Sequence, residues 1–205
     1  MKLYDGLGPN PHAARLALAE KDLPYERVEI DIVQNESRTG DYVARINPAG
    51  TIPALETDDG QVICEIGAIA EYLDEIAPER PLIGATVAER AQTRMWARRL
   101  DLEIGVPLAI AFQAGRARKF FEGRKLLPRA EAAGDFLAIA LDRLAWLERQ
   151  MGDNQWICGD RFSWADIPLF AYMEFFEAKG RQDYPRVGWV EGWRQRMRAR
   201  ERYVA

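Results

Sequence analysis

Few side chains in this sequence could carry acid–base, nucleophilic or metal chemistry, and their number limits the possible reactions. His12 is the one histidine, which excludes mechanisms that need two imidazoles, including histidine-rich metal sites. The two cysteines, Cys64 and Cys158, lie far apart in apolar surroundings, so they predict neither a disulfide scaffold nor a zinc cluster. The sequence therefore predicts a protein without a bound metal, in a reducing compartment.

Three other positions have a setting in which they could act. Asn10 precedes Pro11 where a helix is expected to begin, which predicts Asn10 as the N-cap and Pro11 as the first helical residue. Pro53 follows Ile52 at the mouth of a strand; with a cis peptide it would leave the flanking N–H and C=O groups unpaired, and a peptide-like ligand could pair with them. Glu65 precedes a helix, whose dipole stabilises a carboxylate.

These residues must be positioned by a short α/β region at the start of the chain. Apolar alternation, helix-forming runs and turn signals predict strands over 1–5, 25–32, 54–57 and 62–64, and helices over 11–22 and 66–76. An Asp-Gly pair at 59–60 predicts a hairpin between the last two strands. The polar stretch 34–41 predicts a loop with a short helix. The expected order is β-α-β-α-β-β-α.

The rest of the chain changes character, with long segments of helical period and no convincing strand. Ser163 and Asp166 have the spacing of a capping box, which predicts a helix start at that point. We therefore predict an α/β domain over 1–77, a linker over 78–86 and an all-helical domain over 87–205.

Composition excludes several kinds of partner. The 205 residues are 48% hydrophobic and 29% charged, with a net charge of −4, so nucleic acid is not an expected partner. No apolar run approaches the roughly 20 residues that cross a bilayer, and no signal peptide is visible, so we expect a cytoplasmic protein without a membrane partner.

Taken in order, these segments make the sequence resemble the cytosolic glutathione transferases along nearly its whole length. Residues 47–55 read NPAGTIPAL and match the family's N-P-x-G-x-[IV]-P-x-L segment. Residues 65–73 read EIGAIAEYL and match E-S-x-A-I-x-x-Y-L, with Ile66 where the family has serine. Residues 159–166 read GDRFSWAD and match the helix cap of the second domain. The resemblance implies a thioredoxin-like domain followed by an all-helical domain, glutathione as co-substrate and a homodimer.

The resemblance also implies roles for named residues of this chain. Thr51, Ile52 and Pro53 would dock the cysteinyl backbone of glutathione. Glu65 would receive the α-ammonium of the ligand. Because Ile66 lacks the family's hydroxyl, the γ-glutamyl carboxylate would depend on backbone N–H groups at that helix start.

The residue that activates the thiol is the point of departure from the family. Members use Tyr, Ser or Cys near the end of the first strand, yet positions 5–12 hold no hydroxyl and no thiol. Residues 9–12, PNPH, are similar to the P-N-G-H stretch of nu-class transferases, in which an asparagine amide approaches the sulfur, and this implies Asn10 as the activator. Helix capping alone also explains Asn10, and both interpretations are compatible because a helix start lowers a thiol pKa. Tyr4 is expected to pack within its strand, and His12 to be solvated.

The helical domain carries a basic patch with interleaved aromatic residues. The resemblance implies that Phe112, Phe120 and Phe121 line the acceptor-substrate pocket, which would favour aromatic or anionic acceptors. A solvated surface is the alternative interpretation of this patch.

The resemblance implies a glutathione transferase or a glutathione-dependent disulfide reductase, with the bound thiolate as nucleophile and a small electrophilic or disulfide substrate. The alternative is a catalytically weak relative that binds ligands or a protein partner. Pro53 and Glu65 favour the enzyme, whereas Ile66 and the missing Tyr, Ser or Cys favour the alternative.

Overall fold

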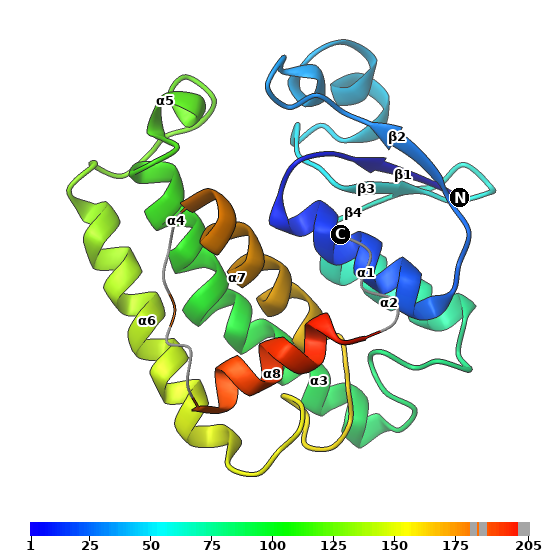
Figure 1. Cartoon of the computed structure of the whole chain (residues 1–205). Helices are drawn as coiled ribbons and strands as arrows, with labels where there is room; N and C mark the ends of the chain where they lie inside the picture. Colours follow the sequence, from blue (N-terminus) through cyan, green and yellow to red (C-terminus); the bar gives the residue numbers. More distant parts are fainter. Residues whose placement is uncertain (181–183, 185–187, 201–205) are drawn as a thin grey trace. The chain divides into compact units, whose positions relative to one another are not determined.

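The computed structural model describes residues 1–180, 184 and 188–200 (Figure 1). The chain divides into two compact units, of which the first spans Met1–Ala85 and the second begins at Thr86. Each unit has its own core.

The first unit is built on a four-stranded sheet in the order β2-β1-β3-β4. β1 pairs in parallel with β2 and antiparallel with β3, and β3 pairs antiparallel with β4. The helices α1 and α2 lie side by side against one face of the sheet (Figure 1). The elements are β1 (Lys2–Asp5), α1 (Pro9–Lys21), β2 (Glu26–Glu29), the 3₁₀ turn η1 (Glu36–Arg38), the π-helical turn η2 (Tyr42–Ile46), β3 (Ala54–Glu56), β4 (Val62–Cys64) and α2 (Ile66–Ile76).

The core of this unit forms where the sheet meets the two helices. Leu3 and Leu55 occupy facing positions on β1 and β3, and both are fully buried. Small residues such as Ala13 and Ala17 on α1 leave room for the larger side chains of α2, of which Leu73 is fully buried.

A buried ion pair fastens α1 to the end of α2. Lys21 Nζ lies 2.6 Å from Asp74 Oδ1 and donates a second hydrogen bond to the carbonyl of Ala77. The same carboxylate accepts the backbone N–H groups of Leu82 and Ile83 at 2.6 and 3.2 Å. Because all partners are satisfied internally, the charges of this pair are compensated despite their burial.

Two predicted boundaries in this unit are wrong, and each has a physical reason. α1 begins at Pro9 with Gly8 as its N-cap, so Asn10 lies inside the first turn and is not the cap. Pro9 fits the first helical position as well as Pro11 does, because its ring fixes a helical φ. The second strand covers only four residues instead of eight, since it pairs with β1 alone and β1 ends at Asp5.

Other predicted elements are confirmed. β4 and α2 have the predicted bounds, and the hairpin between β3 and β4 turns at Gly60 with φ of +86°. β3 ends at Glu56, one residue early, because Thr57 makes turn hydrogen bonds with Gln61. The short helix expected within 34–41 is η1, whereas η2 was not predicted.

The described part of the second unit is helical, apart from two isolated β-bridges near Trp156. Its helices are α3 (Val87–Leu100), the π-helical turn η3 (Asp101–Gly105), α4 (Val106–Ala114), α5 (Arg118–Phe121), α6 (Ala132–Met151), α7 (Asp166–Gly180) and α8 (Gly188–Arg198). An α/β unit followed by an all-helical unit confirms the predicted fold class.

Asp166 connects three segments of the second unit through one buried carboxylate. Oδ1 accepts the N–H of Ile157 at 3.0 Å and the indole N–H of Trp193 at 2.9 Å, while Oδ2 accepts the N–H of Ser163 at 2.9 Å. The Ser163 hydroxyl in turn accepts the N–H of Ala165. The carboxylate half of the predicted capping box is therefore present, whereas the Ser163 hydroxyl accepts from Ala165 instead of from the N–H of Asp166, which bonds to the Ser163 carbonyl. Burial raises the pKa of Asp166 to about 6, because the loss of hydration outweighs these hydrogen bonds.

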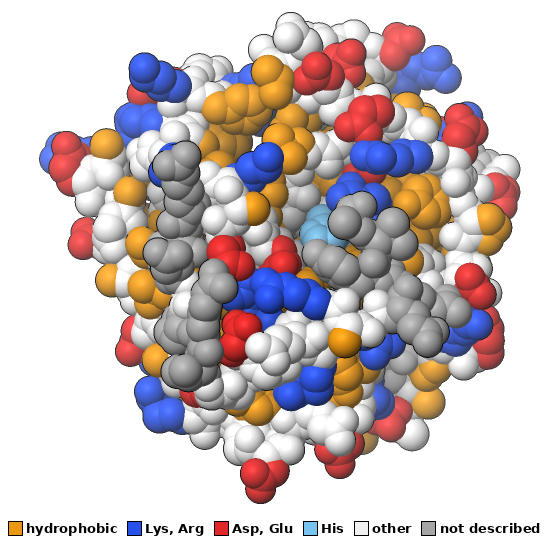
Figure 2. All heavy atoms as spheres, viewed as in Figure 1, with side chains coloured by type: hydrophobic (Ala, Val, Ile, Leu, Met, Phe, Trp, Pro, Cys, Tyr) orange, Lys and Arg blue, Asp and Glu red, His pale blue; other side chains and the backbone are white. Residues whose placement is uncertain are grey.

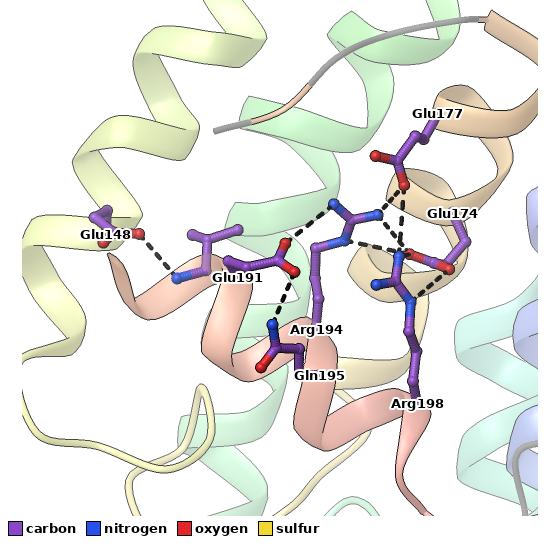
Figure 3. A network of polar contacts seen from close by, with 8 residues as sticks. Glu148, Glu174, Glu177, Glu191, Arg194, Gln195 and Arg198 are labelled. Atoms are coloured by element: carbon purple, nitrogen blue, oxygen red, sulfur yellow. Dashed lines mark hydrogen bonds and ion pairs between the residues drawn. The ribbon is translucent and has the colours of Figure 1, made fainter. Parts of the chain in front are cut away.

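A second polar network joins α7 and α8 (Figure 3). The buried Arg194 guanidinium forms ion pairs with Glu174 at 2.7 Å, with Glu177 and with Glu191, and Arg198 also pairs with Glu174. At the start of α8, Glu148 of α6 accepts the N–H groups of Trp189 and Val190 at 2.6 and 2.9 Å. The free N-terminal donors of α8 are thus satisfied by a carboxylate, which the helix dipole also favours.

We expect Asp166→Ala to lower the free energy of unfolding by about 4 kcal/mol, because three buried donors lose their acceptor at once. Asp160→Ala, which removes an exposed carboxylate from the same loop, serves as the control and should change it by less than about 0.5 kcal/mol. Urea unfolding at pH 5 and pH 7 measures the change in the free energy of unfolding for both variants.

The pH dependence of that difference has a defined sign. The folded pKa of Asp166 lies above its unfolded value, so ionisation disfavours the folded state. The free energy of unfolding of wild type should exceed that of Asp166→Ala by a margin that falls as the pH rises from about 4 through about 6. An advantage that grows over this range would show that the hydrogen bonds outweigh the cost of burial.

Candidate functional site

The first turn of α1 has few backbone N–H groups that could donate to a ligand. Pro9 and Pro11 have no N–H group, and the N–H of His12 bonds to the carbonyl of Gly8 at 3.3 Å. Asn10 therefore supplies the one N–H of this turn that has no hydrogen-bond acceptor among the described residues. A single free donor at the positive end of a helix is a suitable partner for an anion.

The side chain of Asn10 also lacks an internal partner. Its Oδ1 atom is buried and accepts no hydrogen bond within the described part of the chain. Since buried polar atoms in proteins are normally paired, an unpaired one calls for an explanation such as a ligand or water. Asn10 therefore has a backbone N–H free to donate and a buried side-chain oxygen free to accept, and capping uses neither.

The loop before α1 is held by a buried carboxylate at the end of β1. Asp5 is fully buried and pairs with Arg15 of α1 and with Arg27 of β2, both at 2.5 Å. The next residue, Gly6, has no room for a side chain: a Cβ there would lie 2.6 Å from the carbonyl oxygen of Ile30 and 2.8 Å from Cδ1 of Ile52. The turn that leads into α1, where Asn10 lies in the first helical turn, therefore packs against the Ile52 side chain.

The Ile52–Pro53 peptide bond is cis. The carbonyl of the preceding Thr51 accepts two hydrogen bonds, from the Tyr42 hydroxyl at 2.6 Å and from the Asn47 amide at 2.8 Å. In contrast, the backbone N–H and C=O of Ile52 make no hydrogen bond to any described residue. The structure thus fixes one side of this turn and leaves the backbone of Ile52 unpaired.

Tyr42 and Asn47 were not identified as site residues from the sequence. Asn47 stands in the matched segment, and its Oδ1 accepts the N–H of Ala49 at 3.0 Å, a local turn that an Asn-Pro pair favours. Tyr42 lies on η2, where no sequence pattern indicates that its hydroxyl reaches Thr51.

Glu65 connects β4 to α2 in a strained conformation. Its φ of +69° is rare for a residue with a side chain, and such strain is often found at functional sites. Glu65 is exposed and forms no side-chain cap on α2, so the first N–H groups of that helix, at Ile66 and Gly67, donate no hydrogen bond to its carboxylate. Pairing of Ala54 with Cys64 places this helix start beside the Ile52 turn.

Tyr4 is unsuited to stabilise a thiolate. Its hydroxyl donates a hydrogen bond of 2.6 Å to Glu56, and burial together with this carboxylate raises its pKa to about 12. The ring contacts Tyr42 edge to face, with centroids 5.9 Å apart. The structure gives Tyr4 a packing role, as the sequence suggested.

Neither cysteine is poised as a nucleophile. Burial raises the pKa of both thiols, and Cys158 contacts the Ser163 hydroxyl at 3.3 Å in the core of the second unit. Cys64 is half-buried, with its sulfur 3.9 Å from the carbonyl oxygen of Ile46. Among the described residues, no group of three or more His, Cys, Asp or Glu side chains is arranged to hold a metal ion.

The second unit contains a hollow of about 230 Å³ between α4, α6 and α7. Phe112 and Phe176 form its aromatic wall, with ring centroids 5.3 Å apart, and Arg116 is the one charged residue in its lining. The sequence placed Phe112, Phe120 and Phe121 in one pocket. The structure brings Phe112 to this hollow, whereas Phe120 and Phe121 lie on α5 and are not part of its lining.

The two halves of the chain match the two domains of one protein family. Residues 7–76 match the glutathione S-transferase N-terminal domain, and residues 113–199 match the glutathione S-transferase C-terminal domain. Glutathione S-transferase 2 of Saccharomyces cerevisiae is 29% identical over 208 residues, covering 98% of this chain and 86% of the yeast protein.

Solved structures agree in sequence and in fold. A glutathione S-transferase domain-containing protein of Marinobacter aquaeolei is 32% identical, with a TM-score of 0.89 and full coverage of both chains. A glutathione transferase homologue from Sulfitobacter, solved with bound glutathione, is 26% identical with a TM-score of 0.77, covering 98% of this chain and 93% of the other. Since both halves match and the identity extends along the whole length, the chain belongs to the glutathione S-transferase superfamily.

Proposed function

We propose that this protein binds glutathione in its first unit and uses the glutathione thiolate as a nucleophile. The observation that carries the proposal is the grouping of unpaired polar groups in that unit: the backbone of Ile52, the start of α2 after Glu65, and Asn10. The packing of Gly6 against Ile52 and the pairing of Ala54 with Cys64 keep these groups in one region.

In this proposal the backbone of glutathione extends the sheet at the Ile52–Pro53 turn. The N–H and C=O of Ile52 would pair with the cysteinyl residue, while Thr51 is held in place by Tyr42 and Asn47. The exposed carboxylate of Glu65 would receive the α-ammonium. The γ-glutamyl carboxylate would bind the N–H groups of Ile66 and the following residue, where the dipole of α2 favours an anion.

Activation of the thiol is assigned to Asn10, as in the nu-class-like interpretation of residues 9–12. Its side-chain amide and its free N–H would donate to the sulfur, and the dipole of α1 would lower the thiol pKa. The thiolate then attacks one of two kinds of substrate. Attack on a carbon that bears a halide forms a thioether and releases the halide ion. Attack on one sulfur of a disulfide forms a mixed disulfide and releases the other sulfur as a thiolate.

The acceptor is assigned to the second unit. The hollow beside Phe112 is largely apolar and has Arg116 at its edge, which suits an aromatic acceptor with an anionic group. Phe120 and Phe121 are left out of this assignment because they do not line the hollow.

The alternative is a protein of this family with little catalytic activity that binds ligands. Two observations favour it: Tyr4 is committed to Glu56, and Ile66 replaces the family's serine. Turnover of a chromogenic aryl halide and of a mixed disulfide separates the two, since the alternative predicts glutathione binding with neither reaction.

Glutathione should raise the melting temperature by roughly 5 °C at a concentration about 100 times its Kd, because a ligand that binds only the folded state stabilises it. Glu65→Gln should remove most of this shift, whereas Glu79→Gln, an equal charge change at an exposed site outside the candidate region, should retain it. Differential scanning fluorimetry provides the comparison. If millimolar glutathione gives no shift in wild type, the proposed binding is wrong.

Asn10→Asp should cut turnover by about 10- to 100-fold while preserving the fold. A carboxylate facing the sulfur would repel the thiolate and raise its pKa, and the loss of one donor to an anion has effects of this size. Tyr4→Phe is the control and should keep its rate within about twofold, because the Tyr4 hydroxyl is occupied by Glu56. An unchanged rate and pH profile in Asn10→Asp would exclude the assigned role.

The second unit also supports the expected homodimer. Met95, Arg99, Leu102 and Val106 recur at helical spacing along α3, η3 and α4, and the three apolar side chains are 38 to 47% exposed. The Arg99 guanidinium lies over the rings of Trp96 and Trp146, at 5.1 and 5.5 Å. This apolar stripe beside α6 is suited to a two-fold contact with a second copy of the chain.

Sedimentation should therefore give about twice the 23.3 kDa of one chain. Leu102→Glu should yield monomers by placing a charge in the contact, whereas Val87→Glu, at an exposed position at the start of α3, should leave the dimer intact. A wild-type monomer at all micromolar concentrations would contradict the dimer.

A further inference from the structure

Positive charge is concentrated in the segment that joins α4 to α6. Residues 116–129, here called the basic loop, hold six Lys or Arg residues and one Glu, a net charge of +5. The rest of the chain holds 22 Lys or Arg and 31 Asp or Glu, a net charge of −9. The cations are Arg116, Arg118, Lys119, Arg124, Lys125 and Arg129. Such segregation in an acidic protein points to a negatively charged partner for this loop.

The loop is folded into a defined shape by its own contacts. Arg118 pairs with Glu122 at 2.8 Å and donates to the carbonyl of Pro128 at 2.8 Å, which ties the two ends of the loop together. The loop includes the short helix α5, which lies at one end of the helical unit (Figure 1). The one acidic residue of the loop is already neutralised internally by Arg118.

Apolar groups lie among these cations. Phe120 and Phe121 contact each other with centroids 4.9 Å apart, and Leu126 is 97% exposed. Arg124 lies over the Phe120 ring at 3.7 Å, and Lys125 lies near Phe121 at 5.8 Å. In Figure 2, Lys and Arg side chains gather with hydrophobic ones around the end of the unit where α5 lies, at the upper left.

We propose that the basic loop docks on the surface of a bilayer rich in anionic phospholipid. Cations with long apolar stems, aromatic rings and an exposed Leu126 form the mixture that binds at the headgroup boundary. Each Lys or Arg held near an anionic bilayer strengthens binding by about fivefold. No helix within the described residues could cross a membrane, but an interfacial contact of this kind needs no spanning segment.

Other acidic partners suit the loop less well. A single-stranded nucleic acid would stack its bases on exposed aromatic faces, yet the face of Phe120 is covered by Arg124. A folded acidic protein would provide the charge but gives no reason for a leucine side chain that stands almost fully in solvent. The proposal does not depend on glutathione binding, and its test does not use turnover.

The test is flotation of the full-length protein with vesicles of phosphatidylcholine alone or with about one third phosphatidylglycerol. Wild type should bind the anionic vesicles at least tenfold more strongly than the neutral ones, and high salt should abolish the difference. Equal binding to both kinds of vesicle, or binding to neither, would overturn the proposal. If wild type does not bind the anionic vesicles but binds soluble polyglutamate, the proposal is wrong and the partner is an acidic protein.

Two matched triple variants locate the surface. Lys119→Gln with Arg124→Gln and Lys125→Gln should weaken binding to anionic vesicles by at least tenfold. Lys2→Gln with Arg149→Gln and Lys179→Gln changes the net charge equally at exposed positions elsewhere and should retain most of the binding. Equal losses in the two variants would show that overall charge, and not the loop, governs binding. Thermal unfolding of each variant verifies that it is folded.

Leu126→Ser tests the apolar contribution separately. It should weaken binding by about fivefold without changing the dependence on salt, because it removes a buried hydrocarbon contact and no charge. If Leu126→Ser binds as wild type does, the loop does not enter the headgroup boundary, and the proposed mode of docking is wrong.

Discussion

The first unit depends on the close packing of two turns, Gly6 after β1 and Ile52 before β3. A side chain at Gly6 would collide with the Ile30 carbonyl and with the Ile52 side chain, so only glycine allows this approach. The packing places the turn that leads into α1, whose first helical turn holds Asn10, against Ile52 of the cis Ile52–Pro53 peptide. Asp5, which precedes Gly6, is fixed by ion pairs of its buried carboxylate with both Arg15 and Arg27.

The proposed site relies on backbone groups more than on side chains. Two prolines remove donors from the first turn of α1 and leave the N–H of Asn10, while Ile66 provides the start of α2 with no hydroxyl. Helix dipoles and free N–H groups bind anions without a particular side chain, so a glutathione site can persist after the family's usual side chains have been replaced. The proposed site therefore does not require the family's side chains at the two positions where this chain departs from the motif.

Local sequence signals predicted the fold well where one interaction sets a boundary. α2 and β4 have the predicted bounds because the Asp-Gly pair of the hairpin and Pro78, which follows the end of α2, are local signals. The start of α1 was wrong because Pro9 and Pro11 both fit the first helical position, and Asn10 between them resembles a cap.

Tertiary contacts of the site were beyond the reach of sequence patterns. The hydrogen bond from Tyr42 to Thr51 and the separation of Phe112 from Phe120 and Phe121 both depend on how distant segments pack. The most direct test of the proposed site is the amide spectrum of the ¹⁵N-labelled full-length protein during titration with glutathione. The account predicts that the largest shifts occur at Asn10, Ile52, Ile66 and Gly67. Shifts confined to the second unit, or no shifts at saturating glutathione, would contradict it.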